Sequence, residues 1–283
     1  MTGLAPAELP AGLYLVATPI GNLRDMTLRA IDVLGAVDLV LCEDTRMTGK
    51  LLQAHGIKAR KLEVYNDHSA DRMRPKILEQ LASGRSIALV SDAGMPLISD
   101  PGFKLVRDAQ DLGLAVTSLP GANAVLTALQ LSGLPTDKFC FLGFLPPKDK
   151  ARREMLRDWA DVPGTLVAYE SAPRLIDSLR AMAEVFGPKR IAAVTRELTK
   201  MFEEIRRDTL ENLVLHYDEN GPPKGEIVIV IAPPEPKTYD DQALETLLRR
   251  ALEDHSVKDA AALVAEQTGM PKKSLYELAL TLK

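Results

Sequence analysis

The chain has 283 residues, of which 46% are hydrophobic and 26% charged, with a formal net charge of −4. This is enough for about two domains of roughly 150 residues each, and the composition excludes collagen-like, disordered and disulfide-stapled proteins. The charge balance argues against a protein that binds nucleic acid over its whole surface, although a local basic face is sufficient to contact RNA phosphates.

The sequence favours a cytoplasmic protein without membrane contact. Its longest apolar runs, Gly12–Ala17 and Ile227–Ala232, are far shorter than the roughly 20 residues of a membrane span, and its first residues lack a signal-peptide pattern. Cys42 and Cys140 lie in apolar contexts, so we expect buried free thiols in a reducing compartment. Neither the cysteines nor the four histidines have metal-ligand spacing, and no metal site is expected.

From residue 12 to about residue 120, short apolar runs alternate with helix-length amphipathic stretches. The expected strands are Leu13–Ala17, Leu39–Cys42, Ile87–Ser91 and Ala115–Leu119. The first expected helix follows an N-cap at Asp25 and has Leu28, Ile31 and Leu34 on one face. Two further helices are expected to end at Gly56 and at Gly84. A fourth is expected to have Pro101 in its first turn and to stop at Gly113. This alternation predicts an N-terminal α/β domain, residues 1–122, with a mostly parallel sheet.

A second alternating block predicts another α/β domain over residues 123–235, with a link at residues 134–140. Its expected strands are Thr165–Tyr169, Arg190–Thr195 and Glu226–Ala232, and its expected helices cover about residues 149–160, 173–186 and 209–217. After a proline-rich linker at residues 233–238, residues 239–283 are expected to form a helical extension, with helices over about residues 240–254, 258–268 and 271–282. Its spacing is similar to a helix-turn-helix, and a plain helical hairpin is the alternative.

Three loops with glycine and proline follow the strands of the first domain, at the edge where ligands bind in such sheets. They are Thr18–Asn22, Ser91–Pro96 and Leu119–Ala124. Glycine allows the backbone to approach a ligand closely, so these loops form the candidate ligand site. The fingerprints of dinucleotide-binding proteins, phosphate-binding P-loops, zinc proteases and Gly-x-Ser-x-Gly hydrolases are absent from the sequence.

Seven segments match one known family, in the same order and over nearly the whole chain. They are Leu13–Asp25, Cys42–Arg46, Ser91–Gly102, Pro120–Ala124, Phe139–Pro146, Tyr169–Arg174 and Thr195–Lys200. In these segments the chain resembles the ribosomal RNA small subunit methyltransferase I family, within the tetrapyrrole-methylase (class III) superfamily. The helical tail is similar to the helix-turn-helix extension of that family.

The resemblance implies a 2′-O-ribose methyltransferase that uses S-adenosylmethionine and acts on cytidine 1402 of 16S rRNA in the small ribosomal subunit. It also implies a homodimer, with the cofactor in a cleft between two α/β domains. Because the 2′-hydroxyl group is absent from DNA, DNA is not expected to be a substrate.

The resemblance places cofactor ligands on both domains, where ordinary turns and strand ends are the alternative interpretation. They are Pro19, Gly21, Asn22, Asp92, Ala93, Gly94, Pro96, Gly121 and Ala122 in the first domain, and Tyr169, Glu170, Glu197, Gly225 and Glu226 in the second. Alignment of two reactants contributes about 7–11 kcal/mol, more than a general base supplies, so we expect these loops to dominate catalysis.

The candidate catalytic residues are Glu43, Asp44, Arg46 and Lys200. Either carboxylate is placed to orient or deprotonate the ribose hydroxyl, and the two cations have the charge to meet RNA phosphates. Structural ion pairs are the alternative. The candidate RNA-binding residues lie in two basic clusters, for which a solvated helix or strand face is the alternative: Lys148, Lys150, Arg152 and Arg153 in one, and Arg196, Arg206 and Arg207 in the other.

Two other functions compete with rRNA methylation. A methyltransferase of the same fold that acts on a tetrapyrrole-like small molecule predicts a wide apolar trough. A non-catalytic rRNA-binding assembly factor predicts damaged cofactor loops, whereas all three loops keep their glycines. Fold analogy alone does not decide between these functions.

Overall fold

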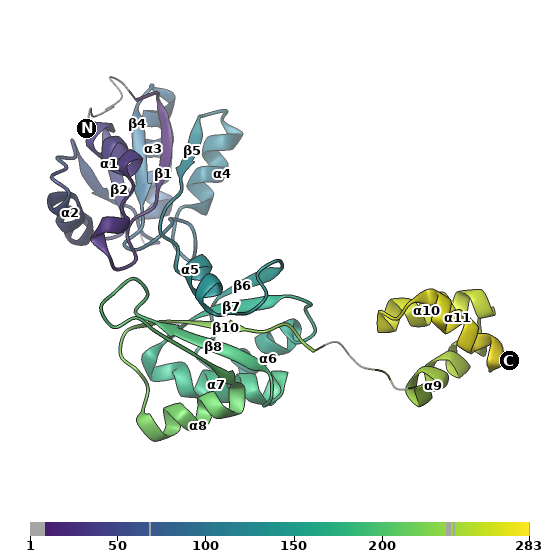
Figure 1. Cartoon of the computed structure of the whole chain (residues 1–283). Coiled ribbons are helices and arrows are strands. Elements are labelled where there is room, and N and C mark those ends of the chain that lie inside the picture. Colours follow the sequence, from purple (N-terminus) through teal and green to yellow (C-terminus); the bar gives the residue numbers. More distant parts are fainter. Residues whose placement is uncertain (1–8, 68, 236–238, 240, 283) are drawn as a thin grey trace. The chain divides into compact units, whose positions relative to one another are not determined.

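The computed structural model describes residues 9–67, 69–235, 239 and 241–282. The chain divides into two compact units, residues 1–234 and 235–283. Figure 1 shows that the first unit consists of two α/β lobes, each built on one five-stranded sheet. In the described part of the chain, no helix has both the length and the apolar character needed to cross a membrane.

The first lobe has a wholly parallel sheet with the strand order β3-β2-β4-β1-β5. Its strands are β1 (Gly12–Val16), β2 (Leu39–Cys42), β3 (Leu62–Val64), β4 (Ser86–Val90) and β5 (Val116–Leu119). Its helices are η1 (Leu23–Asp25), α1 (Leu28–Ala36), α2 (Thr45–Ala54), α3 (Ala70–Ala82) and α4 (Phe103–Asp111). Every residue of β2 and β4 is buried, and all of them except Ser86 are apolar, as expected for central strands covered on both faces.

The second lobe has a mixed sheet with the strand order β6-β7-β10-β8-β9, in which only β6 and β7 pair in parallel. Its strands are β6 (Phe139–Phe144), β7 (Thr165–Ser171), β8 (Ile191–Arg196), β9 (Glu204–Thr209) and β10 (Glu226–Ile231). Its helices are α5 (Ala124–Leu131), α6 (Asp149–Trp159), η2 (Ala172–Arg174), α7 (Leu175–Phe186) and α8 (Leu210–Asn220).

Strand β10 builds both cores of the second lobe because successive side chains of a strand point to opposite faces. Ile227, Ile229 and Ile231 pack in the core that contains residues of α6, α7 and α8. Val228 and Val230 pack in the other core, with residues of α5 and with Ile20, which follows β1. The first lobe therefore contributes a side chain to the core of the second.

The second unit consists of α9 (Asp241–Leu252), α10 (Val257–Thr268) and α11 (Lys272–Thr281). The three helices pack around a small core that includes Leu248, Val264 and Leu275. The Ser256 hydroxyl accepts the Asp259 N–H at the start of α10, and the helix ends at Gly269, whose φ of 71° suits glycine. Residues 236–238 of the expected linker and residue 240 lie outside the described residues.

The α/β architecture with a helical extension is confirmed, but the expected start of the first helix is wrong. The N-cap is Thr27, whose hydroxyl accepts the Ala30 N–H, whereas Asp25 belongs to the short helix η1. Of the three residues expected on one face, Leu34 is buried together with Ala30 and Val33, whereas Leu28 is 80% exposed. Similarly, α4 is N-capped by Gly102, so Pro101 precedes the helix rather than lying in its first turn.

Some elements carry no strong pattern in the sequence and were not expected. Strands β3, β6 and β9 and helix α5 are of this kind, and β6 begins inside the expected link at residues 134–140. Strand β9 is an edge strand rich in charge, so it lacks an apolar run. The expectation that Cys140 is buried is also wrong, because this residue on β6 is half-buried, whereas Cys42 is buried.

Replacement of Ile229 by Ala is expected to destabilise the first unit by about 3 kcal/mol, because it leaves a cavity in a packed core. Ile229 is 0% exposed and lies on the central strand β10. Leu28→Ala is the control, with an expected change of less than about 0.5 kcal/mol at an exposed position. Urea unfolding followed by circular dichroism measures both, and equal losses in the two variants would contradict this account of the core.

Candidate functional site

A cavity of about 510 Å³ is lined by residues of both lobes. Its volume lies within the range of roughly 300–1,000 Å³ that is typical of small-molecule sites. The first lobe contributes residues that follow β1, β2 and β4, at the edge where parallel sheets bind ligands. The lining consists of Ile20, Glu43, Asp92–Met95, Ile98–Asp100, Asn123, Ala124, Phe144, Tyr169–Pro173 and Gly225–Val228.

The loops after β1 and β4 are held together by backbone hydrogen bonds. The Thr18 N–H donates to the Gly94 oxygen at 2.9 Å, and the Gly94 N–H donates to the Thr18 oxygen at 3.0 Å. The Ser91 hydroxyl also donates to the Gly94 oxygen, at 3.1 Å. Gly94 has a φ of +82°, and a Cβ there would lie 3.2 Å from a methyl carbon of Ile20. Glycine is therefore needed at this point of the cavity wall.

The cavity wall brings together about half of the residues expected to bind a cofactor. Those that line it are Asp92, Ala93, Gly94, Tyr169, Glu170, Gly225 and Glu226, together with the catalytic candidate Glu43. The other expected ligands are not among its lining residues: Pro19, Gly21, Asn22, Pro96, Gly121, Ala122 and Glu197. The catalytic candidates Asp44, Arg46 and Lys200 are also outside the lining.

The glycines outside the lining are explained by contacts within the protein. A Cβ at Gly21 would lie 2.5 Å from the Cγ of Lys200, in the second lobe. A Cβ at Gly121 would lie 2.7 Å from the Cβ of Ala17. Pro19 and Pro96 are buried. Close packing between the lobes therefore requires glycine at position 21, and the expected approach of Gly21 to a ligand stays a prediction.

The segment after β8, residues 197–203, contacts the loop after β1. The Asn22 N–H donates to the Thr199 hydroxyl at 3.1 Å. Glu197 and Thr199 have φ values of 47° and 66°, a conformation that costs about 1–3 kcal/mol per residue and persists where surrounding contacts fix it. The Lys200 Nζ lies 2.9 Å from a Glu197 carboxylate oxygen and 3.0 Å from one of Glu226. Lys200 and Glu197 thus neutralise each other beside the lobe contact.

Carboxylates gather where β2 and β4 end. Burial, together with the negative charges of Asp92 and Asp67, raises the pKa of Glu43, although the Asp92 N–H bound to it acts in the opposite direction. Burial and the charge of Glu43 raise the pKa of Asp100 to about 6. Asp44 is different, because its hydrogen bonds with Arg46 lower its pKa to about 2.

Sequence reasoning did not single out Asp100, although the residue lies in a segment that carries the family resemblance. Its position depends on a turn in which Leu97 and Ser99 adopt φ values of 72° and 69°. Residues other than glycine rarely adopt this backbone conformation, and no local pattern in the sequence indicates it. Asn123, Phe144 and Ser171 line the cavity and were likewise not singled out.

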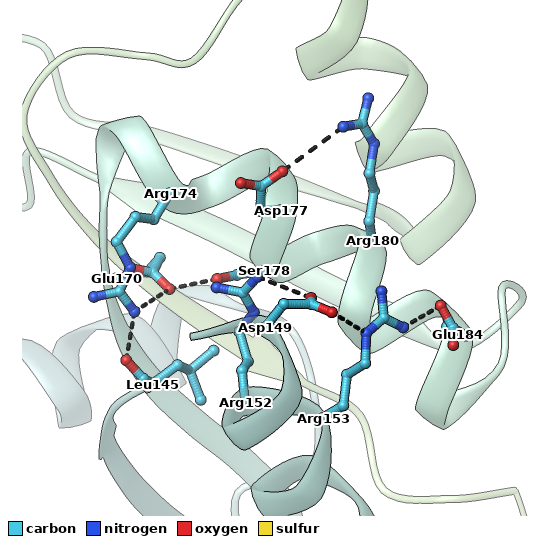
Figure 2. Close-up of polar contacts among 10 residues, drawn as sticks. All are labelled: Leu145, Asp149, Arg152, Arg153, Glu170, Arg174, Asp177, Ser178, Arg180 and Glu184. Carbon is cyan, nitrogen blue, oxygen red and sulfur yellow. Dashed lines mark hydrogen bonds and ion pairs between the residues drawn. The ribbon is translucent and has the colours of Figure 1, made fainter. Parts of the chain in front are cut away.

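The carboxylate of Glu170 is enclosed in the second lobe and does not face the cavity. Its side chain is 0% exposed, and it accepts the Ser171 N–H at 2.8 Å and the Ser178 hydroxyl. The Arg174 guanidinium lies 3.2 Å from it and also donates to the Leu145 oxygen (Figure 2). This carboxylate fixes the end of β7 and η2, which form part of the wall, and the expected cofactor contact of Glu170 stays a prediction.

The first basic cluster, Lys148, Lys150, Arg152 and Arg153, has fewer exposed cations available for RNA binding than the sequence suggests. The Arg152 side chain is only 4% exposed, which contradicts its assignment to an exposed RNA-binding face. It pairs with Asp149, and Arg153 pairs with both Asp149 and Glu184 (Figure 2). The burial arises because Arg152 lies on the inward face of α6, beside the buried Leu156 position of that helix.

In the second basic cluster, acidic neighbours compensate two of the three arginines. Arg196 and Arg206 both pair with Glu204, at 2.9 Å and 3.4 Å. Arg207 is exposed, and one of its guanidinium nitrogens would lie 3.0 Å from a Cβ added at Gly133. Lys148 and Lys150 are exposed at the start of α6.

Comparison with known proteins shows similarity along the whole chain. Residues 12–214 match the Tetrapyrrole (Corrin/Porphyrin) Methylases, and residues 239–283 match the RsmI C-terminal HTH domain. Ribosomal RNA small subunit methyltransferase I of Erythrobacter litoralis is 54% identical over 275 residues, which cover 97% of this chain and 96% of the relative. The protein of the same name from Mesorhizobium japonicum is 46% identical over 282 residues, covering 100% and 96%.

A solved structure shares the fold of the first unit. It is uroporphyrin-III C-methyl transferase from Thermus thermophilus complexed with S-adenyl homocysteine. The TM-score is 0.54 at 19% sequence identity, and the match covers 78% of this chain and 97% of the other. At this identity the likeness establishes the architecture of the two lobes.

Asp100→Asn is expected to stabilise the protein near pH 7.5 by about 1 kcal/mol. The pKa of this carboxyl group rises from 3.8 to about 6 on folding, so its ionisation lowers the free energy of unfolding of the protein as the pH increases through that interval. The full shift corresponds to about 3 kcal/mol, which solvent screening reduces because Asp100 is partly exposed. Thermal unfolding at about pH 7.5 and pH 4 tests this prediction. The difference in stability between variant and wild type should disappear at the lower pH, where the carboxyl group is protonated in the folded protein.

Glu170→Gln is expected to lower stability by about 1–3 kcal/mol, because it weakens charged hydrogen bonds in an enclosed network. Glu184→Gln, at a 64% exposed side chain, is the matched control for loss of a carboxylate that pairs with an arginine. Urea unfolding of both variants provides the measurement. A Glu170 variant as stable as the Glu184 variant would contradict the structural role of Glu170.

Proposed function

The chain belongs to the ribosomal RNA small subunit methyltransferase I family of the tetrapyrrole methylases, and we propose that it methylates the ribose 2′-hydroxyl of a cytidine in 16S rRNA, cytidine 1402 in the family. The match to the family and the identity to its members confirm the resemblance found in the sequence, and the chain is a methyltransferase. The observation that carries the proposal is similarity over the full length, which includes the helical extension at residues 239–283.

We propose S-adenosylmethionine as the methyl donor, and the cavity fits it in size and chemistry. When bound, this cofactor supplies an electrophilic methyl group on a positively charged sulfur atom. The Gly94 backbone is fixed at the wall by hydrogen bonds with Thr18, the Asp92 N–H donates to Glu43, and Phe144 and Tyr169 supply aromatic rings. These groups would hold the cofactor, and the neighbouring carboxylates suit its positive charge.

Among the four catalytic candidates, the geometry favours Glu43 as the group that orients or deprotonates the ribose hydroxyl. Glu43 is the one of the four that lines the cavity, and its raised pKa brings it closer to the working pH of a general base. Asp44 has a pKa of about 2 and is held by Arg46, which makes it a poor proton acceptor. The Arg46 side chain is 85% exposed and is proposed to meet an RNA phosphate.

The proposal extends to the partners and the organisation of the chain. Residues 1–122 and 123–235 are proposed as the two domains that enclose the cofactor, and residues 239–283 as an extension that contacts the substrate. Lys148, Lys150 and Arg207 are the exposed members of the two basic clusters and are proposed to contact rRNA. A homodimer in the cytoplasm, acting on the small ribosomal subunit, completes this assignment.

Transfer of a labelled methyl group from S-adenosylmethionine to small subunits that lack the modification tests the proposed reaction. Nuclease mapping and mass spectrometry of the product should locate the label on the 2′-oxygen of one cytidine. Label on a base, or transfer to tetrapyrroles in place of rRNA, would overturn the assignment. Deproteinised 16S rRNA as a parallel substrate establishes whether the assembled subunit is required.

Glu43→Gln is expected to reduce the rate of the methyl-transfer step by about 10²–10⁴-fold, because general-base assistance is worth that much. Asp44→Asn is the control, since asparagine preserves the N-cap of α2 and the lowered pKa of Asp44 gives it no role as a base. Single-turnover rates with saturating subunits measure both variants. Equal loss of rate in the two would contradict the assignment of Glu43.

A further inference from the structure

The first lobe presents three carboxylates to the cavity without a compensating cation. Glu43, Asp92 and Asp100 line it, and in the described part of the chain no lysine or arginine forms an ion pair with any of them. The described lining residues include no lysine, arginine or histidine. The fourth carboxylate that faces the cavity, that of Glu226, is paired with Lys200. The wall of the first lobe is therefore a region of negative potential.

Asp100 is the carboxylate most affected by this arrangement. It is half-buried, and the like charges that act on it are Glu43 after β2, Asp92 after β4 and Asp67 before α3, whereas a hydrogen bond with the Ser91 side chain acts in the opposite direction on its pKa. Tyr169 of β7 lines the same cavity from the other lobe, and its pKa is raised to about 12 by burial and then by the charge of Asp100. A carboxylate surrounded in this way is stabilised by a cation that enters the cavity.

The proposed reaction changes the charge of the molecule that occupies the cavity. As the new carbon–oxygen bond forms at the ribose, the carbon–sulfur bond breaks, its electron pair remains on sulfur, and the hydroxyl proton leaves to a base. S-adenosylmethionine thus loses its positive sulfur and becomes S-adenosylhomocysteine, which carries one positive charge fewer. The size and shape of the two molecules differ by a single methyl group, so charge is the larger difference between them.

We propose that Asp100 determines specificity by charge: its carboxylate favours the cationic cofactor over the spent product and thereby assists product release. The inference rests on the proposed function. A charge interaction of this kind acts on the donor and is absent for the product, whereas backbone contacts from Asp92–Gly94 hold both alike.

The preference is expected to depend on pH. Above about pH 6 the carboxyl group of Asp100 is ionised in the free protein and attracts the donor. Below that pH it is protonated, so affinity for S-adenosylmethionine should fall while affinity for S-adenosylhomocysteine stays nearly constant. Glu43, whose pKa is also raised, contributes to the same trend, and for this reason a variant of Asp100 is needed to isolate its part.

Calorimetric titration of the full chain with each of the two ligands, at about pH 7.5 and pH 5.5, tests the inference without RNA. Asp100→Asn should weaken binding of S-adenosylmethionine about fivefold to tenfold at the higher pH, the effect of one partly screened charge. Binding of S-adenosylhomocysteine should change less than about twofold. Asp111→Asn, which removes an exposed carboxylate at the end of α4, is the matched control and should alter neither.

The outcomes separate the inference from the function on which it rests. Equal weakening of both ligands, or no change in either, would overturn charge selection by Asp100 while leaving the methyltransferase assignment intact. Failure of the wild-type chain to bind either ligand would overturn the proposed cofactor and the inference together. The pH dependence of ligand binding can be measured on the wild type alone. A ratio of S-adenosylmethionine to S-adenosylhomocysteine affinity that is constant from about pH 7.5 to pH 5.5 would also contradict the proposal.

Discussion

The parallel pairing of β2 with β4 is the constraint on which the candidate site depends. The register joins Leu41 to Leu89, so the residues just beyond both strands emerge side by side at one edge of the sheet. There the Asp92 N–H donates to the Glu43 carboxylate and the Asp44 N–H donates to the Asp92 carboxylate, each at 3.3 Å. These backbone donors hold like charges together, which explains how the protein maintains an acidic wall that destabilises its own fold.

The second lobe stabilises the opposite wall by a different means. There the carboxylate of Glu170 is fully enclosed, accepts hydrogen bonds from Ser171 and Ser178, and is compensated by the Arg174 guanidinium. The residues that this lobe presents to the cavity include the aromatic Phe144 and Tyr169 and the aliphatic Ile227 and Val228. The first lobe therefore provides carboxylates that form no ion pair in the described residues, whereas the carboxylates of the second lobe's lining are paired with Arg174 or Lys200; the packing of Ile20 in the second core joins the lobes.

The sequence was a good guide where a pattern arises from burial or from a repeated motif. Strands such as Leu39–Cys42, the glycine that ends α2 and the helical extension follow from apolar periodicity and capping. It was a poor guide where tertiary contacts decide, as with the exposed Leu28, the buried Arg152 and the turn that places Asp100. The site was anticipated as a set of loops, but which residues line the cavity depends on how two distant segments meet, and spacing along the chain does not contain that information.

The charged residues of strand β9 have a consequence for how the edge of the second sheet meets other chains. Arg206 and Arg207 resemble part of a nucleic-acid-binding cluster in the sequence, and they are flanked by Glu204 and Asp208 on the edge strand of the second sheet. An edge strand exposes unpaired N–H and C=O groups to any other extended chain, and charged side chains along it make such pairing unfavourable. The mixed charges of β9 therefore protect this protein against aggregation by strand addition, independently of any role in catalysis.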